Sequence, residues 1–264
     1  MQIRPHPGLA HLIRHYLVLD GASAASGIHR LFADGNTGLV FNLDHATLCV
    51  AGDKPADHAC WLYGQVKTYH DLSLTGNINW LVVVLQPYAA YHLWRVPAIE
   101  WFNCLFPATE VLGNRVYAIT NELAKTPEVY ERIRLLDNYF LQETAKDPNP
   151  DPLVVQAVRD INTQDGRLSI ESLLQQLAVS ERTLERKFKL HVGITPKRLS
   201  DIVRLTRSAK KMQQLQGRQL TGVAYEGGYF DQAHFIKEFK KYTGITPHQY
   251  HAQAYPLALN FLQL

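Results

Sequence analysis

The sequence has few cysteines and no motif built from them. Its three cysteines, Cys49, Cys60 and Cys104, include no Cys-x-x-Cys pair. A disulfide scaffold or a cysteine zinc site needs cysteines in paired, closely spaced sets. An odd number of scattered cysteines favours a reduced protein, so we expect a cytoplasmic one.

Long apolar runs and targeting signals are also missing. The chain has no stretch of about eighteen apolar residues, and its N-terminus does not pass from basic to apolar residues as a signal peptide does. The sequence therefore predicts neither a membrane span nor export.

Motifs of common enzyme classes are absent too: no P-loop, no Rossmann fingerprint and no Gly-x-Ser-x-Gly. His11 and His15 stand four apart, as two ligands on a helix would, but no carboxylate completes a metal site. We expect no catalytic residues, metal or cofactor. The other histidines of this region are expected at the surface or hydrogen-bonded in the core: His29, His45, His58 and His70.

Charge is distributed unevenly along the chain. Residues 1–150 carry a net charge of −3 and residues 151–264 one of +6. A basic half beside a mildly acidic half suggests that only one domain contacts phosphate.

A proline-dense segment divides the two halves. Prolines at 148, 150 and 152 cannot continue a helix, so residues 148–152 are predicted to be a linker. The expected domains are 1–147 and 153–252, followed by an apolar tail, 253–264.

The most informative feature is an internal repeat in the basic half. Phe188-Lys189 and Gly193-Ile194-Thr195-Pro196 recur, 51 residues later, as Phe239-Lys240 and Gly244-Ile245-Thr246-Pro247. Such a repeat indicates one supersecondary unit used twice.

Each copy is predicted to be two short helices around a tight turn. In the first, Ser169 and Ser180 can cap successive helices, and Gly193 can end the second of them. In the second copy, Thr221 opens a helix, Asp231 replaces Ser180, and Gly244 replaces Gly193. Between the copies, residues 196 to about 215 are predicted to form one long helix.

This arrangement is typical of the helix-turn-helix, whose second helix can enter a DNA major groove. Arg182, Glu185, Arg186 and Lys189 share one helix face, opposite the apolar Leu184 and Phe188. A solvated charged face is the alternative for one copy, but two copies in register favour DNA binding. The candidate base-reading residues are Arg182, Glu185, Arg186, Gln232, Ala233, Ile236 and Lys237. The candidate phosphate-contacting residues are Ser180, Lys189, Lys197, Arg198, Lys210, Lys211, Asp231, Lys240, Lys241 and Thr246.

Residues 152 to 252 resemble the DNA-binding domain of the AraC/XylS family of bacterial transcription regulators. The resemblance implies seven helices, two helix-turn-helix units and a joining helix. Gly227, an extra glycine before the second turn, departs from the pattern and is expected to loosen that unit. The residues that carry the resemblance are Ser180, Leu184, Phe188-Lys189, Gly193, Thr195-Pro196, Arg204-Leu205, Ala209, Gly228-Tyr229, Asp231, Phe235, Phe239-Lys240, Gly244, Thr246-Pro247 and Tyr250.

The N-terminal half is predicted to be a small β-barrel or sandwich followed by helices, which gives an α+β multidomain chain. Its expected strands include Tyr16–Leu19, Leu39–Leu43, Trp61–Tyr63 and Trp80–Leu85, and its expected helices are Tyr88–Val96, Arg115–Ala124 and Glu128–Thr144. This half resembles, less specifically, the cupin-like sensor domain of some family members. That resemblance, carried by Phe32–Gly35, Leu39–Leu43, Gly64 and Leu85–Pro87, implies a barrel whose trailing helices often dimerise.

Four aromatic residues, Trp61, Tyr63, Tyr69 and Trp80, are candidates to line a pocket for an apolar or planar effector. Ordinary core packing is the alternative, because aromatic side chains dominate cores as well.

The leading hypothesis is a sequence-specific DNA-binding regulator whose N-terminal domain senses a small-molecule effector or dimerises. The alternatives are control by a protein partner docked on that domain, or an enzyme fused to a DNA-binding domain. Double-stranded DNA is the expected partner, with RNA polymerase added if the protein is an activator. A homodimer is expected through the Glu128–Thr144 helix, and the tail is expected to dock in an apolar groove.

Overall fold

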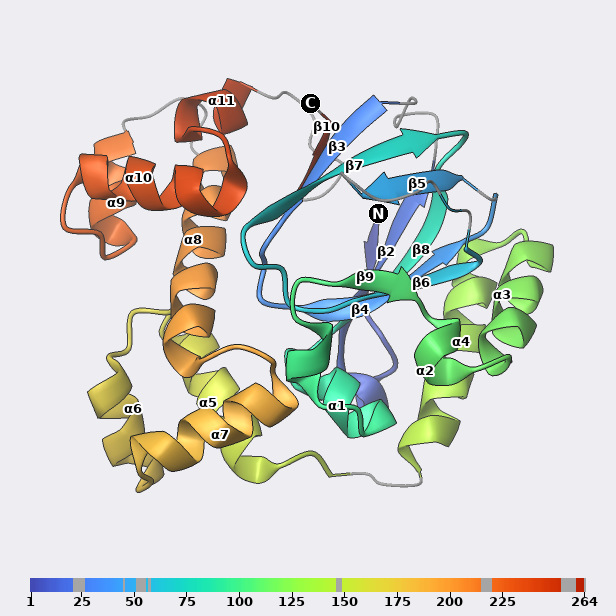
Figure 1. The fold of residues 1–264 in the computed structure, drawn as a ribbon, viewed down its shortest axis with the longest axis horizontal. Helices are drawn as coiled ribbons and strands as arrows, with labels where there is room; N and C mark the ends of the chain where they lie inside the picture. Colours follow the sequence, from blue (N-terminus) through green and yellow to red (C-terminus); the bar gives the residue numbers. More distant parts are fainter. Residues whose placement is uncertain are drawn as a thin grey trace.

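The structure is a computed structural model that describes residues 1–20, 27–44, 46–50, 56, 58–145, 149–214, 220–252 and 260–263. A sheet-rich N-terminal domain lies beside a helical C-terminal domain (Figure 1). His45 and most of the tail lie outside the described residues.

The larger sheet is built around β8, which is buried on both faces. Trp80, Val82 and Val84 point toward the second sheet, whereas Leu81 and Val83 join the core on the other side. The strand order is β1 (Gln2–Ile3), β2 (Ile13–Asp20), β8 (Asn79–Leu85), β4 (Thr37–Asn42), β6 (Cys60–Tyr63) and β9 (Leu105–Pro107), with every pair antiparallel.

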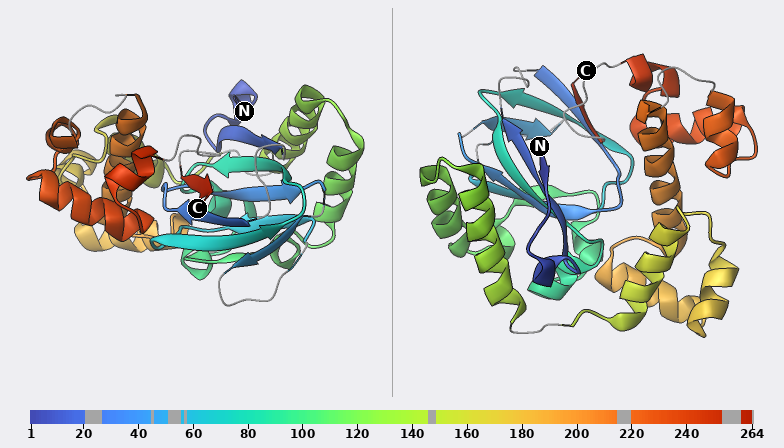
Figure 2. Two further views of the ribbon diagram at one scale, coloured as in Figure 1. Left: turned by 90° about the horizontal axis from the view of Figure 1, so that it is seen from above. Right: turned by 180° about the vertical axis from the view of Figure 1, so that it is seen from behind.

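The smaller sheet contains a strand from the far end of the chain. Its order is β10 (Phe261–Gln263), β3 (Gly27–Phe32), β7 (Tyr69–Thr75) and β5 (Thr47–Val50). Strand β10 therefore returns from the C-terminal domain and pairs with β3 (Figure 2). Within the described residues the two sheets face each other as separate layers, so the expected closure into a barrel is not observed.

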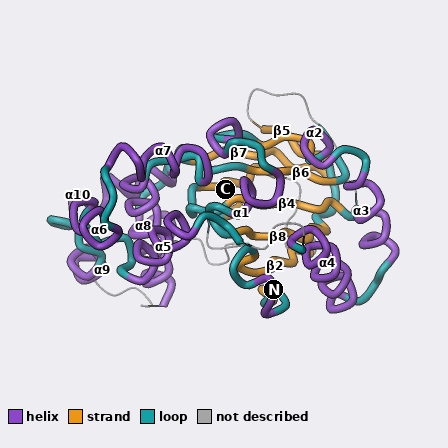
Figure 3. The backbone as a smooth tube through the Cα atoms, turned by 90° about the horizontal axis from the view of Figure 1, so that it is seen from below, coloured by secondary structure: helices purple, strands orange, loops and turns teal. Residues whose placement is uncertain are grey.

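Helices cover the flank of the sheets away from the C-terminal domain (Figure 3). Ile133, Leu136 and Phe140, the apolar side chains of the helix expected to dimerise, are buried in the core of their own domain. These side chains therefore face their own domain and are not available to a partner, and only the outer face of this helix is exposed. The helices on this flank are α2 (Thr109–Leu112), α3 (Arg115–Lys125) and α4 (Val129–Thr144), and η1 (Pro7–Leu9) packs on α4. Helix α1 (Ala89–Trp94) and η2 (Ala98–Trp101) lie on the side that faces the C-terminal domain.

The described part of the C-terminal domain contains the seven expected helices. Their bounds are α5 (Pro152–Thr163), α6 (Ile170–Leu177), α7 (Glu181–His191), α8 (Pro196–Gln214), α9 (Leu220–Glu226), α10 (Gln232–Thr243) and α11 (Pro247–Ala252). Helix α8 connects the two halves of the repeat and, at 1.5 Å per residue, is about 28 Å long.

The extra glycine of the second unit lies in a tight position. A methyl group on Gly227 would come 2.7 Å from Ser208 Oγ on α8 and 2.9 Å from the Val223 carbonyl oxygen. Only a glycine lets α9 approach α8 this closely, so Gly227 permits close packing and the expectation of a looser unit was wrong.

Candidate DNA-binding surface and ligand cavity

The first helix-turn-helix consists of α6 and α7. Ser180 begins α7 by accepting a hydrogen bond from the Thr183 backbone N–H through its side-chain oxygen. Leu184 and Phe188 are buried, and Arg182 and Arg186 on the opposite face are exposed. Lys189 is also exposed and Glu185 is half-buried. The sequence-predicted residues of α7 therefore share one accessible face.

The second unit, α9 and α10, has the same plan with a less polar face. Asp231 caps α10 through the His234 backbone N–H, at 2.7 Å. Ala233 and Lys237 are exposed, and Ile236 is half-buried. Gln232 accepts a hydrogen bond from the Thr221 hydroxyl, at 2.7 Å, so its amide is partly used within the unit. His234 is exposed beside Ala233 and was not among the residues predicted from the sequence.

The candidate phosphate contacts differ in how free their side chains are. Lys189 and Lys240 are exposed, whereas Lys197 is paired with Asp201 at 2.9 Å and Lys241 with Glu238 at 3.3 Å. Lys211 pairs with Glu226, and Lys210 lines a cavity described below. Arg198 points to the N-terminal domain, where it donates to the Lys67 carbonyl. Ser180, Asp231 and Thr246 each cap the start of a helix.

Asp151 links the beginning of the C-terminal domain to the first recognition helix. Its side chain caps α5 through the Leu153 and Val154 backbone N–H groups. It also pairs with Lys187 of α7. Burial raises the pKa of this carboxyl, but the Lys187 ammonium and the backbone N–H groups more than offset that, so its pKa is lowered.

We expect Asp151→Asn to cost about 1 kcal/mol of stability at neutral pH, because asparagine still caps α5 but cannot pair with Lys187. The lowered folded-state pKa stabilises the native protein above the unfolded value of about 3.9, and that stabilisation is lost as pH falls through the folded value. The two stability curves should thus converge as pH falls below the unfolded value and through the lower folded one. Urea unfolding at several pH values measures this, with Asp165→Asn, which removes an exposed pair with Arg207, as the control. If the difference in free energy of unfolding between Asp151→Asn and the unaltered protein stayed constant down to acidic pH, the charge of Asp151 would not have the stabilising role assigned to it.

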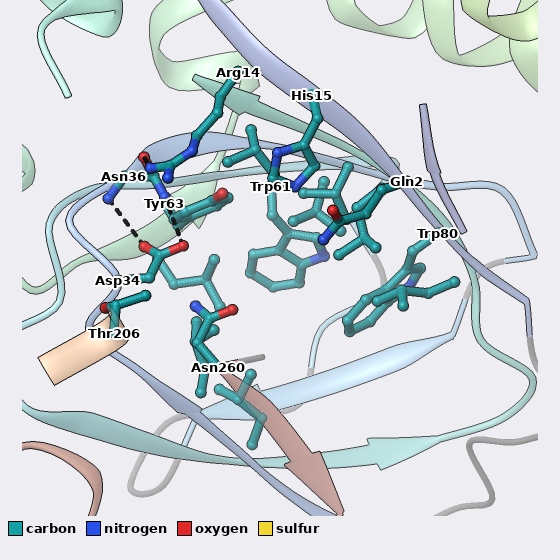
Figure 4. Close-up of a pocket in the computed structure, with 18 of the residues that line it drawn as sticks. Gln2, Arg14, His15, Asp34, Asn36, Trp61, Tyr63, Trp80, Thr206 and Asn260 are labelled. Carbon is teal, nitrogen blue, oxygen red and sulfur yellow. Dashed lines mark hydrogen bonds between the residues drawn. The ribbon is translucent and has the colours of Figure 1, made fainter. Parts of the chain in front are cut away.

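A cavity of about 450 Å³ lies between the two sheets, beneath α8 (Figure 4). Trp61, Tyr63 and Trp80 line it, together with aliphatic side chains from both sheets. The Trp61 indole N–H is buried and has no hydrogen-bond partner among the described residues. Tyr69, the fourth predicted pocket residue, lies outside the cavity and stacks under Arg30, with 4.1 Å from the guanidinium carbon to the ring centre.

Polar groups converge at one end of the cavity. Arg14 donates to Asn36 Oδ1 at 3.0 Å, and Asn36 donates to Asp34 at 2.8 and 2.9 Å (Figure 4). His15 lines the same cavity, and burial, with the Arg14 charge, lowers its pKa, so the imidazole is neutral at pH 7. This cluster could not be predicted from the sequence, because Arg14 and His15 come from β2 whereas Asp34 and Asn36 come from the turn after β3.

The cavity is also walled by the C-terminal half of the chain. Thr206, Arg207, Lys210 and Gln213 of α8 line it, as does Asn260, the residue before β10. The Asn260 side chain donates to the Phe32 carbonyl oxygen at 3.1 Å. A molecule in the cavity would therefore contact both domains.

No helix in the described part of the chain is long and apolar enough to cross a membrane. The described residues also contain no group of three or more metal-binding side chains.

Two family matches divide the chain as the fold does. Residues 173–253 match a helix-turn-helix domain family, and residues 1–107 match a domain of unknown function (DUF6597).

Two bacterial transcription regulators are similar in sequence to part of this chain. An uncharacterized HTH-type transcriptional regulator of Haemophilus influenzae is 37% identical over 81 residues, 31% of this chain and 27% of that protein. The transcriptional activator RhaS of Pectobacterium carotovorum is 32% identical over 94 residues, 36% of this chain and 33% of RhaS. The alignments thus span a third or less of these relatives.

The whole fold is similar to that of ToxT from Vibrio cholerae. A ToxT crystal structure superimposes with a TM-score of 0.53 over 90% of this chain and 97% of ToxT, at 14% identity. At this identity the likeness concerns the fold: a sheet-rich domain followed by a helical one.

Two helix-turn-helix units joined by one long helix define a class of DNA-binding domain. Within that class, the helix-turn-helix match over residues 173–253 supports the resemblance of residues 152–252 to the DNA-binding domain of the AraC/XylS family.

Proposed function

We propose that this protein is a sequence-specific DNA-binding transcription regulator whose N-terminal domain senses a small-molecule effector. The observation that supports DNA binding most directly is the pair of recognition helices. Both bury an apolar face, expose the opposite one and are joined through a single helix. Arg182, Arg186, Lys189, Lys237 and Lys240 are all exposed on these helices.

The test is binding of the full-length protein to duplexes selected from a random library. Each neutralised phosphate contributes about −0.9 to the slope of log affinity against log salt. With about four to six phosphate contacts, affinity should fall roughly 100-fold or more between 50 and 200 mM salt. Failure to enrich any sequence, or an affinity that does not depend on salt, would exclude this function.

The cavity supports a small molecule over a protein partner as the effector. It has apolar walls, a polar end and a buried indole N–H that no described residue accepts from, as a ligand site does. ToxT has been crystallised with an unsaturated fatty acid and with (E)-4-(8-methylnaphthalen-1-yl)but-3-enoic acid. We propose an effector of that kind here, with an apolar body and an acid group.

We expect the naphthalenyl butenoic acid to quench tryptophan fluorescence and to raise the melting temperature. Trp61→Phe keeps most of the apolar wall but removes the N–H donor, so binding should weaken about 10-fold, as for one hydrogen bond to a charged group. Trp94→Phe, on α1 outside the cavity, is the control. Equal binding by both variants would mean that the indole N–H does not contact the ligand.

Further partners are proposals that follow from the family. RNA polymerase is the proposed partner if the protein activates transcription. A homodimer is proposed through the outer faces of α3 and α4, where Tyr117 and Tyr130 are 48% and 69% exposed. Light scattering of the full-length protein tests self-association.

A further inference from the structure

The two glycines of the internal repeat have the same position in the fold. Gly193 and Gly244 follow the two recognition helices, α7 and α10, with φ of 85° and 73°, the left-handed conformation that favours glycine. Each lies directly against the N-terminal domain. A methyl group on Gly193 would be 2.6 Å from the Ala98 carbonyl oxygen, and one on Gly244 would be 2.5 Å from Arg30 Nη1. Both units therefore dock through the same turn.

The first docking point joins α7 to η2 and α1. His191, the last residue of α7, packs edge-on against Tyr91 of α1, with 4.4 Å between ring centres. Arg198, just after the repeated turn, donates to the Lys67 carbonyl and lies over the Phe102 ring. The end of α7 and the start of α8 are thus both held on the N-terminal domain.

The second docking point joins α10 to β3. Arg30 is fixed by two hydrogen bonds to Asp71, at 2.6 and 2.7 Å, and lies over the Tyr69 ring. From there it reaches the Thr243 carbonyl oxygen, at 3.5 Å, in the last turn of α10. A cation is favourable at this end of a helix, where carbonyl groups lack partners. Tyr69 packs beside Gly244.

We propose that the N-terminal domain sets the spacing between the two recognition helices, and that Arg30 and Tyr69 are specificity-determining residues for DNA half-site spacing. This inference rests on the proposed DNA-binding function. Helix α8 is rigid, but each recognition helix is a separate short unit packed on it. Because both units contact the N-terminal domain, their recognition helices are held at a fixed distance and orientation relative to each other. Since one base pair advances a duplex by about 3.4 Å, a small freedom of α10 changes which spacing can be bound.

The cavity offers a way for a ligand to control the relative positions of the two recognition helices. It lies between the sheets and is walled by Thr206, Arg207, Lys210 and Gln213 of α8, the helix that joins the two units. A ligand that shifts α8 relative to the sheets would change the relative positions of the two recognition helices. It could do so because a ligand that contacts two conformations differently changes their populations.

The arrangement can be measured without DNA. Lys189 and Lys240 are exposed, equivalent positions of the repeat, so Lys189→Cys and Lys240→Cys can carry spin labels in a Cys49→Ser, Cys60→Ala, Cys104→Ser background. The protein with both docking points intact should give a narrow distribution of distances between the two spin labels. Arg30→Ala or Tyr69→Ala should widen this distribution about twofold. Arg134→Ala, which removes an exposed ion pair on α4, and Tyr69→Phe should leave it narrow. An unchanged width in both docking variants overturns the inference.

The DNA readout uses the duplex selected by the unaltered protein, with one or two base pairs inserted between its half-sites. We expect the insertion to weaken the unaltered protein about 100-fold and the Arg30→Ala or Tyr69→Ala protein about 10-fold or less, because a freed α10 can follow the displaced half-site. Identical spacing profiles mean that α8 alone sets the distance, and the inference fails.

If the unaltered protein binds no duplex, the proposed function fails, whereas the spin-label distances still test the docking. Circular dichroism confirms that each variant is folded; if Arg30→Ala is not, Tyr69→Ala, with the Arg30–Asp71 pair intact, provides both readouts.

Discussion

Replacing Arg182 and Arg186 together with alanine should reduce affinity for the selected duplex at least about 30-fold, because each bidentate arginine–guanine contact is worth about 1–3 kcal/mol. Both side chains are exposed on the outer face of α7, one helical turn apart. Since the arginines are close enough to couple, the double variant can depart from the sum of the single ones. Arg186→Ala alone should also relax the preference at one base position.

The second recognition helix should behave differently. Ala233 and the half-buried Ile236 offer only apolar contact, and Gln232 is hydrogen-bonded to Thr221, which leaves Lys237 as a charged contact. Lys237→Ala should weaken binding to all sequences alike and lower the salt slope by about one phosphate. Selection experiments on the three variants, with Arg134→Ala as a control for loss of an exposed arginine, compare the helices. Broader specificity in Lys237→Ala than in Arg186→Ala would reverse the assignment.

The helical half could be predicted from sequence because its signals are local. Ser169, Ser180 and Asp231 each cap the helix expected of them, and α8 begins at Pro196 as proposed. Capping depends on a few neighbouring residues, so the chain order is sufficient to find it.

The sheets were predicted only where a strand is buried on both faces or strongly apolar. Strands β8 and β4 gave continuous apolar runs, whereas β3 and β7 alternate with histidine, arginine, aspartate and serine and were missed. Strand β10 consists of three residues and exists only because it pairs with β3, some 230 positions earlier in the chain. No local pattern contains that information.

The candidate cavity was predicted in part for the same reason. Tryptophans at 61 and 80 are large enough to suggest a wall from sequence alone. Arg14, Asp34 and Asn36 become neighbours only when β2 and the turn after β3 meet. Tyr69 was assigned to the cavity from its residue type, but its strand places it against Arg30 and the second helix-turn-helix.

An aromatic series connects the second helix-turn-helix to the N-terminal domain, and Phe239 is at its centre. Its ring lies 5.6 Å from Phe235 and 5.4 Å from Tyr250, and Tyr250 in turn lies 6.2 Å from Phe32 at the end of β3. Phe239 is fully buried, as is its repeat equivalent, Phe188.

Phe239→Ala should therefore destabilise the protein by about 3–5 kcal/mol from lost burial and the cavity it leaves, plus about 0.5–1.5 kcal/mol for each lost aromatic pair. Phe188→Ala should cost less, because burial is its main contribution. Phe230→Ala is a matched control only nine residues away: its ring is 85% exposed, and its loss should change stability by less than about 0.5 kcal/mol. Urea unfolding of the three variants gives the order of their free energies of unfolding. If Phe239→Ala and Phe230→Ala unfolded at the same urea concentration, the aromatic series would not be a structural link between the domains.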